Sequence, residues 1–335
     1  MATSNRDLDK LWDLLLAPVA TQAIGAMARL GVADCLADGP KTTAAIASAV
    51  NAHESSLRRC LRMLTGYGLF ERAGEDAWAL TEMGAALKSD SPMPFRYRAM
   101  VHTDPVNYGI LQRMTECIQT GEPQAEAALG SSAWDFYQSH PEHGGNFGQA
   151  MANFSEESIQ AVVENCDFSA AGTIVDVGGA YGALLAAVLR KAPEAKGVLF
   201  DLPNSVENAD ETLGDVSPRV ERVGGSFLED PLPAGDLFLL KHVLHNWDDA
   251  RCVTILKGIR AAMNPGAKLL VVEVALPEGD AYGPALPMDL LMMVVLGGVE
   301  RTLAEYEALF AQAGLKLAQN IPNDSVFALI EAVAV

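Results

Sequence analysis

The chain has 335 residues, and half of them are apolar, which is enough for the cores of two domains. The net charge of −19 argues against nonspecific binding to nucleic acid or to anionic lipid. The five cysteines are scattered without a C-x-x-C pair, which disfavours zinc and disulfide frameworks and fits a reducing cytoplasm. The polar segment 1–10 is not typical of a secretory signal, and no apolar run reaches the length of a membrane span.

The N-terminal region is predicted to be a winged-helix domain, all-α in class except for a short hairpin. Residues 7–30 carry apolar side chains at helical spacing, and this helix is too apolar to stand alone, so we expect it to pack on a second subunit. Two shorter helices are predicted within 42–64, and the runs 68–72 and 77–81 flank a turn typical of a hairpin. A helix–turn–helix followed by a hairpin is the winged-helix pattern.

Two functions of this domain stay open. It could bind DNA, with Arg58, Arg59 and Arg62 on the phosphates. It could instead pack against a partner subunit and cover an active site. Residues 1–100 are electrically neutral and the rest of the chain is strongly acidic. This charge distribution favours the second interpretation.

The middle of the chain is predicted to be helical and to link two domains. The expected parts are a dimerisation domain at 1–95, a helical linker at 96–165 and an α/β domain at 166–335. The linker contains an aromatic-rich run around Trp134, and a later segment around Met288 is rich in methionine. Such side chains suit a flat apolar ligand, although core packing is their commoner use.

From residue 172 onward, strand-like and helical patterns alternate. This alternation predicts a doubly wound parallel sheet covered by helices on both faces. The two strand-like runs at 315–320 and 326–333 predict a terminal hairpin that adds an antiparallel strand. The predicted strands are 173–177, 197–200, 219–223, 236–243 and 268–275, and the predicted helices are 181–191, 204–213, 249–262 and 302–313.

The segment 174–182 predicts a buried strand followed by a glycine-rich turn, with Asp201 at the end of the next strand. Glycines allow a ligand close to the backbone, and an acid at this spacing can bind both hydroxyls of a ribose. The glycines at 178, 179 and 182 do not match the G-x-G-x-x-G fingerprint of dinucleotide sites. Asp176, inside the strand, would repel a pyrophosphate but suits an ammonium and a sulfonium. The pattern therefore favours S-adenosylmethionine over NAD.

His245 is the strongest candidate for a base, because ligands bind at the carboxyl ends of the strands in such sheets and His245 follows one of them. Glu273 and Glu300 come from neighbouring strand ends and could orient the imidazole. His245 could instead cap the next helix, but Asp248 and Asp249 already suit that position. Trp247 could line a substrate pocket or fill the core.

In combination, the segments 176–182, 200–203, 225–227, 240–249 and 297–302 resemble the small-molecule O-methyltransferases of the caffeic acid and hydroxyindole type. The resemblance extends over nearly the whole chain. It implies a winged-helix dimerisation domain and a class I methyltransferase domain that binds S-adenosylmethionine. The chain departs from the family pattern at Ala180, where a glycine is usual, and at Ser226, where an acid is common.

The resemblance also implies roles for individual residues. His245 matches the base, and Glu273 and Glu300 match the acids beside it. The implied acceptor site includes Met288, Asp289 and Met292, and Trp134 and Trp247 are further candidates for its wall from the sequence itself. The implied cofactor site comprises Asp176, Gly178, Asp201, Leu202, Ser226, Phe227, Lys241, Phe147, Met151 and Ser155.

We therefore predict a cytoplasmic, homodimeric O-methyltransferase that uses S-adenosylmethionine and yields S-adenosylhomocysteine. The expected acceptor is a phenol or enol on a flat natural product, and no metal is expected. One alternative keeps the cofactor but replaces methyl transfer by hydroxylation or a pericyclic reaction. Another is a winged-helix transcription regulator.

Overall fold

The computed structural model describes residues 5–92, 94–279, 282–283 and 285–335. The chain forms two compact units. The first comprises Met1–Gln112 and Glu126–Phe154, and the second comprises Arg113–Ala125 and Ser155–Val335. The helical middle region contributes to both units. The domain boundaries expected after residues 95 and 165 stay a prediction.

The start of the first unit has the predicted winged-helix order, with a small sheet as its wing. Strands β2 and β3 form the expected antiparallel hairpin, and β1 pairs with β3 on its other side. The elements are α1 (Asn5–Leu30), α2 (Val32–Cys35), β1 (Lys41–Thr42), α3 (Thr43–Ala49), α4 (Glu54–Gly66), β2 (Phe70–Arg72), β3 (Ala77–Leu80) and α5 (Glu82–Ala85).

Trp78 on β3 is fully buried at the centre of this small core. Its indole N–H donates to Thr43 Oγ1 at 2.9 Å, and the Thr43 hydroxyl donates to Asp76 at 2.9 Å. Arg58 forms ion pairs with Asp76 and with Glu54. One of the three arginines considered for phosphate binding is therefore paired with two carboxylates of its own domain.

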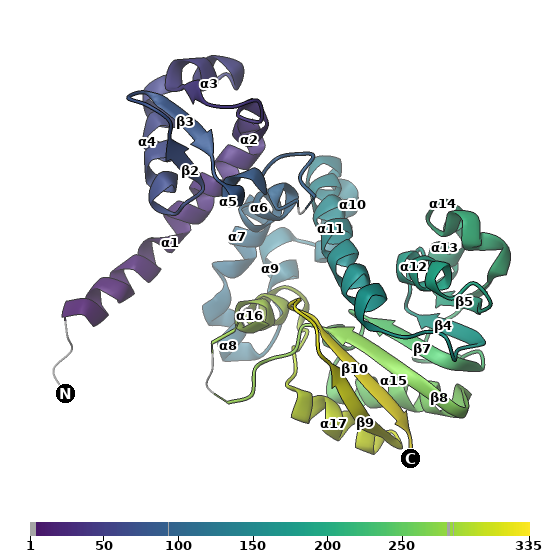
Figure 1. Cartoon of the computed structure of the whole chain (residues 1–335). Coiled ribbons are helices and arrows are strands. Elements are labelled where there is room, and N and C mark those ends of the chain that lie inside the picture. The colour runs from purple at the N-terminus through teal and green to yellow at the C-terminus, as the bar shows by residue number, and fades with distance from the viewer. Residues whose placement is uncertain (1–4, 93, 280–281, 284) are drawn as a thin grey trace. The chain divides into compact units, whose positions relative to one another are not determined.

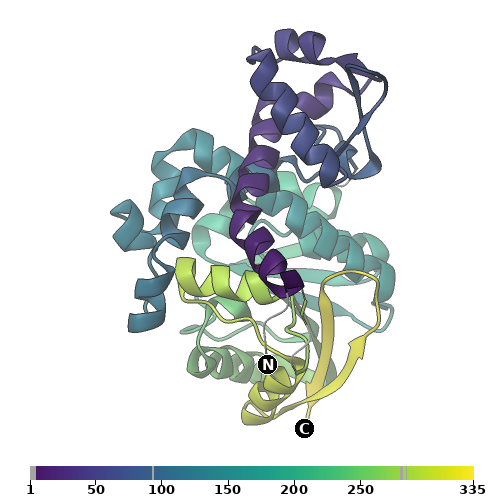
Figure 2. The same ribbon diagram turned by 90° about the vertical axis from the view of Figure 1, so that its left-hand side faces the viewer.

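The first half of α1 projects away from helices α2–α5 (Figures 1 and 2). It presents large apolar side chains to solvent, with exposed fractions of 61% at Trp12, 71% at Leu14 and 62% at Leu15. The stretch Leu8–Leu30 is long and apolar enough to cross a membrane by length and composition, and 22% of an 18-residue window within it is buried. The sequence-based expectation that no apolar run reaches this length is therefore wrong for α1.

The remaining elements of the first unit are short helices and part of one long helix. They match the predicted helical middle region. They are α6 (Arg96–His102), α7 (Pro105–Leu111), α9 (Ala125–Leu129), α10 (Ala133–Ser139) and the part of α11 (Pro141–Asn165) that precedes Ser155.

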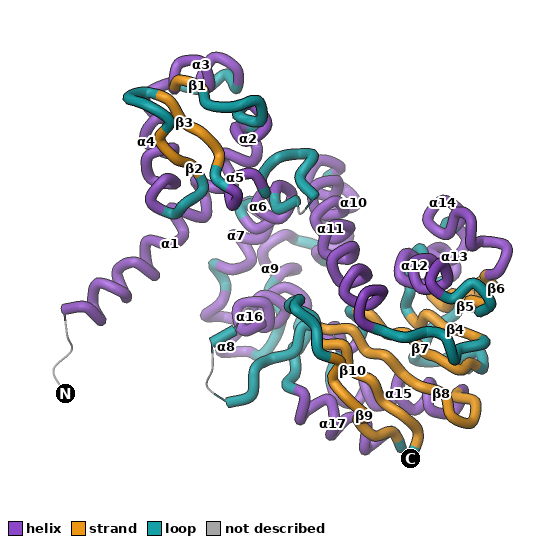
Figure 3. The backbone as a smooth tube through the Cα atoms, viewed as in Figure 1, coloured by secondary structure: helices purple, strands orange, loops and turns teal. Residues whose placement is uncertain are grey.

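The second unit contains a seven-stranded sheet with the order β6-β5-β4-β7-β8-β10-β9 (Figure 3). The first five strands are parallel, and β10 and β9 are antiparallel to their neighbours. The terminal hairpin thus adds two strands to the sheet. The strands are β4 (Thr173–Val177), β5 (Lys196–Asp201), β6 (Val220–Gly224), β7 (Gly235–Lys241), β8 (Met263–Glu273), β9 (Leu315–Ile321) and β10 (Ala328–Ala334).

Helices cover both faces of this sheet, as predicted (Figure 1). One face packs on α15 and α17 through a continuous apolar core that includes Phe238, Ile255 and Phe310. The other face carries α12 and α13. The helices of this unit are α8 (Met114–Thr120), α12 (Ala183–Lys191), α13 (Pro203–Glu207), α14 (Asp210–Leu213), α15 (Asp249–Ala262), α16 (Ala285–Leu296) and α17 (Leu303–Gln312), with 3₁₀ turns η1 (Gly214–Arg219) and η2 (Leu244–Asn246).

Two local features differ from the predicted elements. The predicted helix 204–213 is divided into α13 and α14. Helix α16 was not predicted as an element, because apolar residues occupy nearly all of its positions and leave no helical period to detect. Asp248 caps α15 by accepting from the Arg251 backbone N–H at 2.9 Å, so the helix does not need His245 as its cap.

Candidate active site

The glycine-rich turn after β4 adopts a backbone that most side chains avoid. Gly178 and Gly182 have φ of 70° and 81°, and Ala180 has φ of 50°. A Cβ atom at Gly178 would lie 2.9 Å from Val243 Cγ2 and 3.3 Å from the Phe227 ring. The turn therefore requires glycine at 178 for both conformation and space. Ala180 accepts a conformation that would suit glycine better.

Asp176 lies beneath this turn, with only 1% of its surface exposed. A Cβ atom at Gly179 would come within 2.5 Å of its carboxyl group. Burial raises the pKa of Asp176 to about 7, although nearby Lys241 acts in the opposite direction. Its Oδ2 has no hydrogen-bond partner among the described residues. A positive charge placed near the turn would favour the ionised form of this carboxyl group.

Asp201 ends β5 and faces the same turn. Its two carboxylate oxygens accept hydrogen bonds from the backbone N–H of Ala180 at 2.8 Å and of Leu202 at 2.7 Å. These two bonds fix the carboxylate at the edge of the sheet. Leu202 itself is exposed beside it.

The loop after β6 carries Ser226 and Phe227. The Ser226 backbone N–H donates to Asp230 Oδ2 at 2.8 Å, so an acid that the sequence analysis missed lies at this loop. The Phe227 ring packs edge-on against Trp247, with a centroid distance of 6.1 Å. Phe227 and Trp247 are both half-buried and contribute to the rim of the apolar core.

Lys241, the last residue of β7, donates to Ser155 Oγ at 2.9 Å. Burial lowers the pKa of Lys241, while Asp176 and Glu273 act to raise it. The structure thus brings two of the predicted cofactor residues, Lys241 and Ser155, into direct contact inside the second unit.

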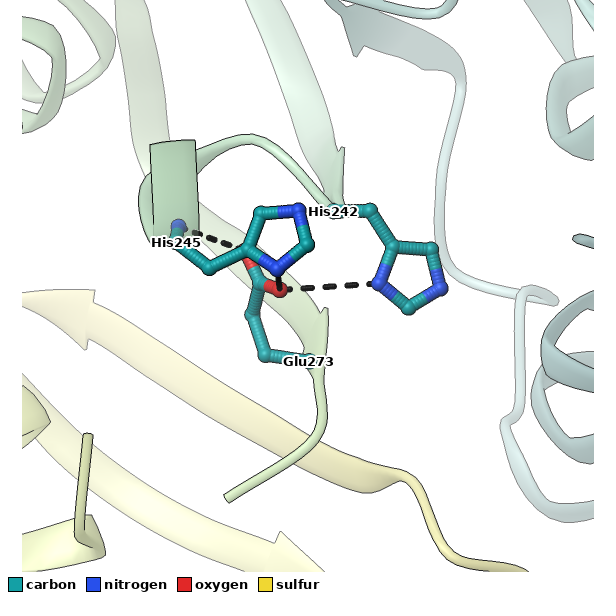
Figure 4. Close-up of side chains that lie close together, drawn as sticks. All are labelled: His242, His245 and Glu273. Atoms are coloured by element: carbon teal, nitrogen blue, oxygen red, sulfur yellow. Dashed lines mark hydrogen bonds and ion pairs between the residues drawn. The ribbon is translucent and has the colours of Figure 1, made fainter. Parts of the chain in front are cut away.

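The register of β7 and β8 assembles the candidate catalytic group. Lys241 pairs with Val272, so the residues that follow, His242 and Glu273, come side by side. His245 lies in the η2 turn just beyond, and Figure 4 shows both imidazoles converging on Glu273. His245 Nδ1 is 3.0 Å from Glu300 Oε1 and 3.7 Å from Glu273 Oε2.

Glu273 is fully buried and uses its two oxygens differently. Oε1 accepts from the backbone N–H groups of Val243, Leu244 and His245 at 3.1, 2.9 and 3.4 Å. Oε2 faces the two imidazoles. The carboxylate therefore both holds the turn and presents negative charge to His245.

The two carboxylates control the protonation of His245. Burial alone would lower its pKa, but the charge of Glu273 and the hydrogen bond that the imidazole donates to Glu300 raise it to about 9. Burial raises the pKa of Glu300. Burial would also raise the pKa of Glu273, but the neighbouring histidines bring it below its usual value.

His242 also belongs to this group. It has φ of 53°, and its Nδ1 is 3.5 Å from Glu273 Oε2. Burial lowers its pKa. Donor atoms of His242, His245 and Glu273 lie within 4.8 Å of one another, a spacing that could also hold a metal ion.

The methionine-rich segment is helix α16, which carries Met288, Asp289 and Met292. Asp289 Oδ1 accepts from the Glu300 backbone N–H at 2.9 Å, which anchors the segment that carries Glu300. Met288 and Met292 are half-buried on the same helix. A Cβ atom at Gly298 would lie 3.2 Å from Met292 Cε.

The remaining predicted site residues, Trp134, Phe147 and Met151, belong to the first unit. Trp134 meets Phe147 edge-on at 5.8 Å, and Tyr137 stacks on Phe147 at 4.3 Å. These rings line a concavity of about 370 Å³ together with Gly144 and neighbouring residues. Met151 is partly exposed on α11.

Comparison with known proteins identifies the family. Residues 111–316 match the model of the O-methyltransferase domain, and residues 12–90 match that of the O-methyltransferase dimerisation domain. The chain belongs to the O-methyltransferase family. Phenazine O-methyltransferase PhzM of Lysobacter antibioticus is 37% identical over 314 residues, which are 93% of this chain and 92% of that protein.

Two solved structures of similar proteins contain the cofactor or its product. CalO1, a methyltransferase in calicheamicin biosynthesis in its SAH-bound form, has a TM-score of 0.91 at 33% identity and covers 100% of both chains. NcsB1, an O-methyltransferase from neocarzinostatin biosynthesis, was solved with S-adenosylmethionine and 2-hydroxy-5-methyl naphthoic acid. Its TM-score is 0.75 at 36% identity, over 94% of this chain and 96% of that chain.

This O-methyltransferase is therefore an S-adenosylmethionine-dependent enzyme of the natural-product type, with the class I methyltransferase fold that the sequence predicted. The residues at the strand ends fit that cofactor. The buried carboxyl of Asp176 and the fixed carboxylate of Asp201 favour a cationic ligand over a pyrophosphate.

Proposed function

We propose that this enzyme methylates a hydroxyl group of a phenol or enol on a small aromatic or polyketide-like natural product, with His245 as the general base. The observation that carries the proposal is the 3.0 Å contact of His245 Nδ1 with Glu300. This contact fixes the proton on Nδ1 and leaves Nε2 to accept the proton of the acceptor hydroxyl.

When bound, S-adenosylmethionine supplies a methyl group on a positively charged sulfur, and the acceptor oxygen displaces the sulfur in one in-line step. The hydroxyl proton passes to His245 Nε2 as the new carbon–oxygen bond forms. Glu273 and Glu300 stabilise the resulting imidazolium. Proton transfer of this kind contributes roughly 10²- to 10⁴-fold to the rate, and alignment of the reacting atoms contributes more.

Roles for the other site residues are proposed from the sequence and from its resemblance to the O-methyltransferase family. We assign the ribose to Asp201 with Leu202 beside it, and the methionine part to the Gly178 turn above Asp176. We assign the adenine to Ser226 and Phe227, with Lys241, Ser155, Phe147 and Met151 completing the cofactor site. We assign the acceptor to Trp134, Trp247, Met288, Asp289 and Met292.

The pH dependence of turnover tests the base. Because a base must be neutral and the pKa of His245 is raised to about 9, kcat/KM at subsaturating S-adenosylmethionine should rise about tenfold per pH unit up to about pH 9. Two acceptors with different hydroxyl pKa values separate ionisation of the enzyme from that of the acceptor. Glu300→Gln removes one of the two carboxylates that raise the pKa of His245. The acidic limb of the pH profile of kcat/KM should therefore move to lower pH. A flat profile between pH 6 and 9 for both acceptors would contradict the assignment.

We further propose that two chains form a cytoplasmic homodimer through the exposed face of α1. The support is the matched dimerisation domain and the unburied Trp12, Leu14 and Leu15. A second copy, rather than a bilayer, would then cover this apolar helix. The five cysteine thiols are free, as expected in a reducing compartment.

Leu14→Glu tests this interface. Burial of one leucine contributes about 1.5–3 kcal/mol, and a homodimer loses it twice, so the variant should run as a 35.6 kDa monomer in light scattering coupled to gel filtration. Met83→Glu replaces a similarly exposed apolar residue on α5 and should leave the dimer intact. A Leu14→Glu variant that retains twice the chain mass would reject this interface.

Neither alternative function is favoured. A methyltransferase-like enzyme with another reaction would transform its substrate without producing S-adenosylhomocysteine. A transcription regulator would shift a DNA fragment in a gel at physiological salt. Incubation with S-adenosylmethionine labelled in its methyl group and a panel of phenols tests the main proposal directly, because label should appear in the product.

A further inference from the structure

We propose that Arg301 is the positioning residue that holds the His245 turn in its catalytic geometry. The proposal rests on the role of His245 as the base. Arg301 directly follows Glu300 in the chain. Although charged, it is only 2% exposed, which makes it one of the largest fully buried side chains of the second unit.

The guanidinium of Arg301 binds the carbonyl groups of the η2 turn from two sides. Nη1 donates to Leu244 O at 3.2 Å, and Nη2 donates to Trp247 O at 2.8 Å. These two carbonyls flank His245 in the chain. Nη1 also donates to Val299 O at 3.2 Å, which ties the turn to the segment that carries Glu300.

Glu273 binds the same turn with the opposite charge. Its Oε1 accepts from the N–H groups of Val243, Leu244 and His245, while Arg301 donates to carbonyl groups on either side of His245. One short turn is thus held by a buried carboxylate through its donors and by a buried guanidinium through its acceptors. Charge-assisted hydrogen bonds of this kind are stronger than neutral ones.

The backbone around Arg301 adds direct contacts to the turn. The Val299 N–H donates to His245 O at 2.8 Å, and a Cβ atom at Gly298 would lie only 2.5 Å from that oxygen. The Arg301 carbonyl accepts from the Leu276 N–H at 2.9 Å. The segment 298–301 therefore lies against the turn at backbone distance and also delivers Glu300 to the imidazole.

The ion pair of Arg301 with Asp249 does not explain why the arginine is buried. Nε and Nη2 donate to Asp249 Oδ1 at 3.0 and 2.8 Å, but the Asp249 side chain is 75% exposed. An ion pair with so exposed a partner contributes little. The planar, five-donor guanidinium is needed to reach three carbonyls at once, and lysine cannot reproduce this geometry.

The test compares Arg301→Lys and Gly298→Ala with the matched control Arg260→Lys. Arg260 on α15 also binds two backbone carbonyls, those of Gly314 at 3.1 Å and Val335 at 3.4 Å. Neither carbonyl belongs to the His245 turn. For each variant, kcat, the acceptor KM, the Kd for S-adenosylmethionine by calorimetry, the pH profile and Tm are measured. Gly298→Ala displaces the same segment without removing a buried charge, so it decides the question if Arg301→Lys does not fold.

We expect both test variants to lose about 10- to 100-fold in kcat, because a misplaced reacting group costs about that much. The Kd for S-adenosylmethionine should stay within about twofold. The acidic limb of the pH profile should move to lower pH as His245 loses its fixed contact with Glu300. Arg260→Lys should keep the parent kcat and pH profile.

Three results would overturn the proposal. Folded variants could keep kcat within twofold, the pH profile could stay unchanged while kcat falls, or kcat and cofactor affinity could fall together with Tm as in a general loss of structure. His245→Ala, assayed alongside, separates the two hypotheses. An active His245→Ala refutes the base itself, whereas an inactive one with normal Arg301 and Gly298 variants refutes only the positioning role.

Discussion

Replacing His245 by alanine is expected to lower kcat by about 10²- to 10⁴-fold while the Kd for S-adenosylmethionine stays within twofold. The range is the usual contribution of a positioned general base. His245 contacts Glu273 and Glu300 through Nδ1, and it makes no contact with the glycine turn or Asp201 among the described hydrogen bonds. Chemistry and cofactor binding should therefore respond separately to this substitution.

The measurement is turnover by S-adenosylhomocysteine formation, paired with calorimetry of the cofactor. His53→Ala is a matched control, because His53 is an exposed imidazole in the N-terminal domain that contacts only Ser56 among the described side chains. It should keep the parent kcat. Turnover of His245→Ala within twofold of the parent across the pH range would reject the base.

The arrangement of the strand ends was predictable because a parallel sheet brings successive carboxyl ends to one edge. The glycine turn, Asp201 and His245 each follow a buried run, and the structure has the corresponding strands at β4, β5 and β7. The contact of His245 with Glu273, the last residue of β8, was predicted on the same reasoning. Glu300 was expected at a neighbouring strand end as well, but it reaches His245 from the loop between α16 and α17. Confirming the positions does not test the assigned roles, which stay proposals.

Other features depend on tertiary contacts that leave no pattern in the sequence. The partners of Arg301 are backbone carbonyls, which every segment possesses, so no side-chain spacing indicates them. The positive φ of Ala180 and His242 is likewise imposed by surroundings, since residues other than glycine adopt it uncommonly. Asp230 reaches the Ser226 loop through a local turn that its sequence distance alone does not specify.

Asp201→Asn is expected to weaken S-adenosylmethionine binding by about 10- to 100-fold. Hydrogen bonds to a charged group contribute about 1.5–3 kcal/mol, and 1.4 kcal/mol corresponds to a tenfold change in Kd. The carboxylate is held by the N–H groups of Ala180 and Leu202, so it reaches the ligand without a cost of reorganisation. Asparagine has the same shape, but its amide has a single oxygen, and the NH2 group in place of the second oxygen can only donate.

Asp215→Asn provides the matched control, because Asp215 is an exposed acid that pairs with Arg190 away from the strand ends. Calorimetry should give the parent Kd for that variant. For Asp201→Asn, kcat at saturating S-adenosylmethionine should recover most of the parent value, since the ribose lies away from the reacting methyl group. An unchanged Kd would reject the ribose assignment, and a raised Kd with a lost kcat at saturation would show that Asp201 acts on the catalytic group rather than on the cofactor alone.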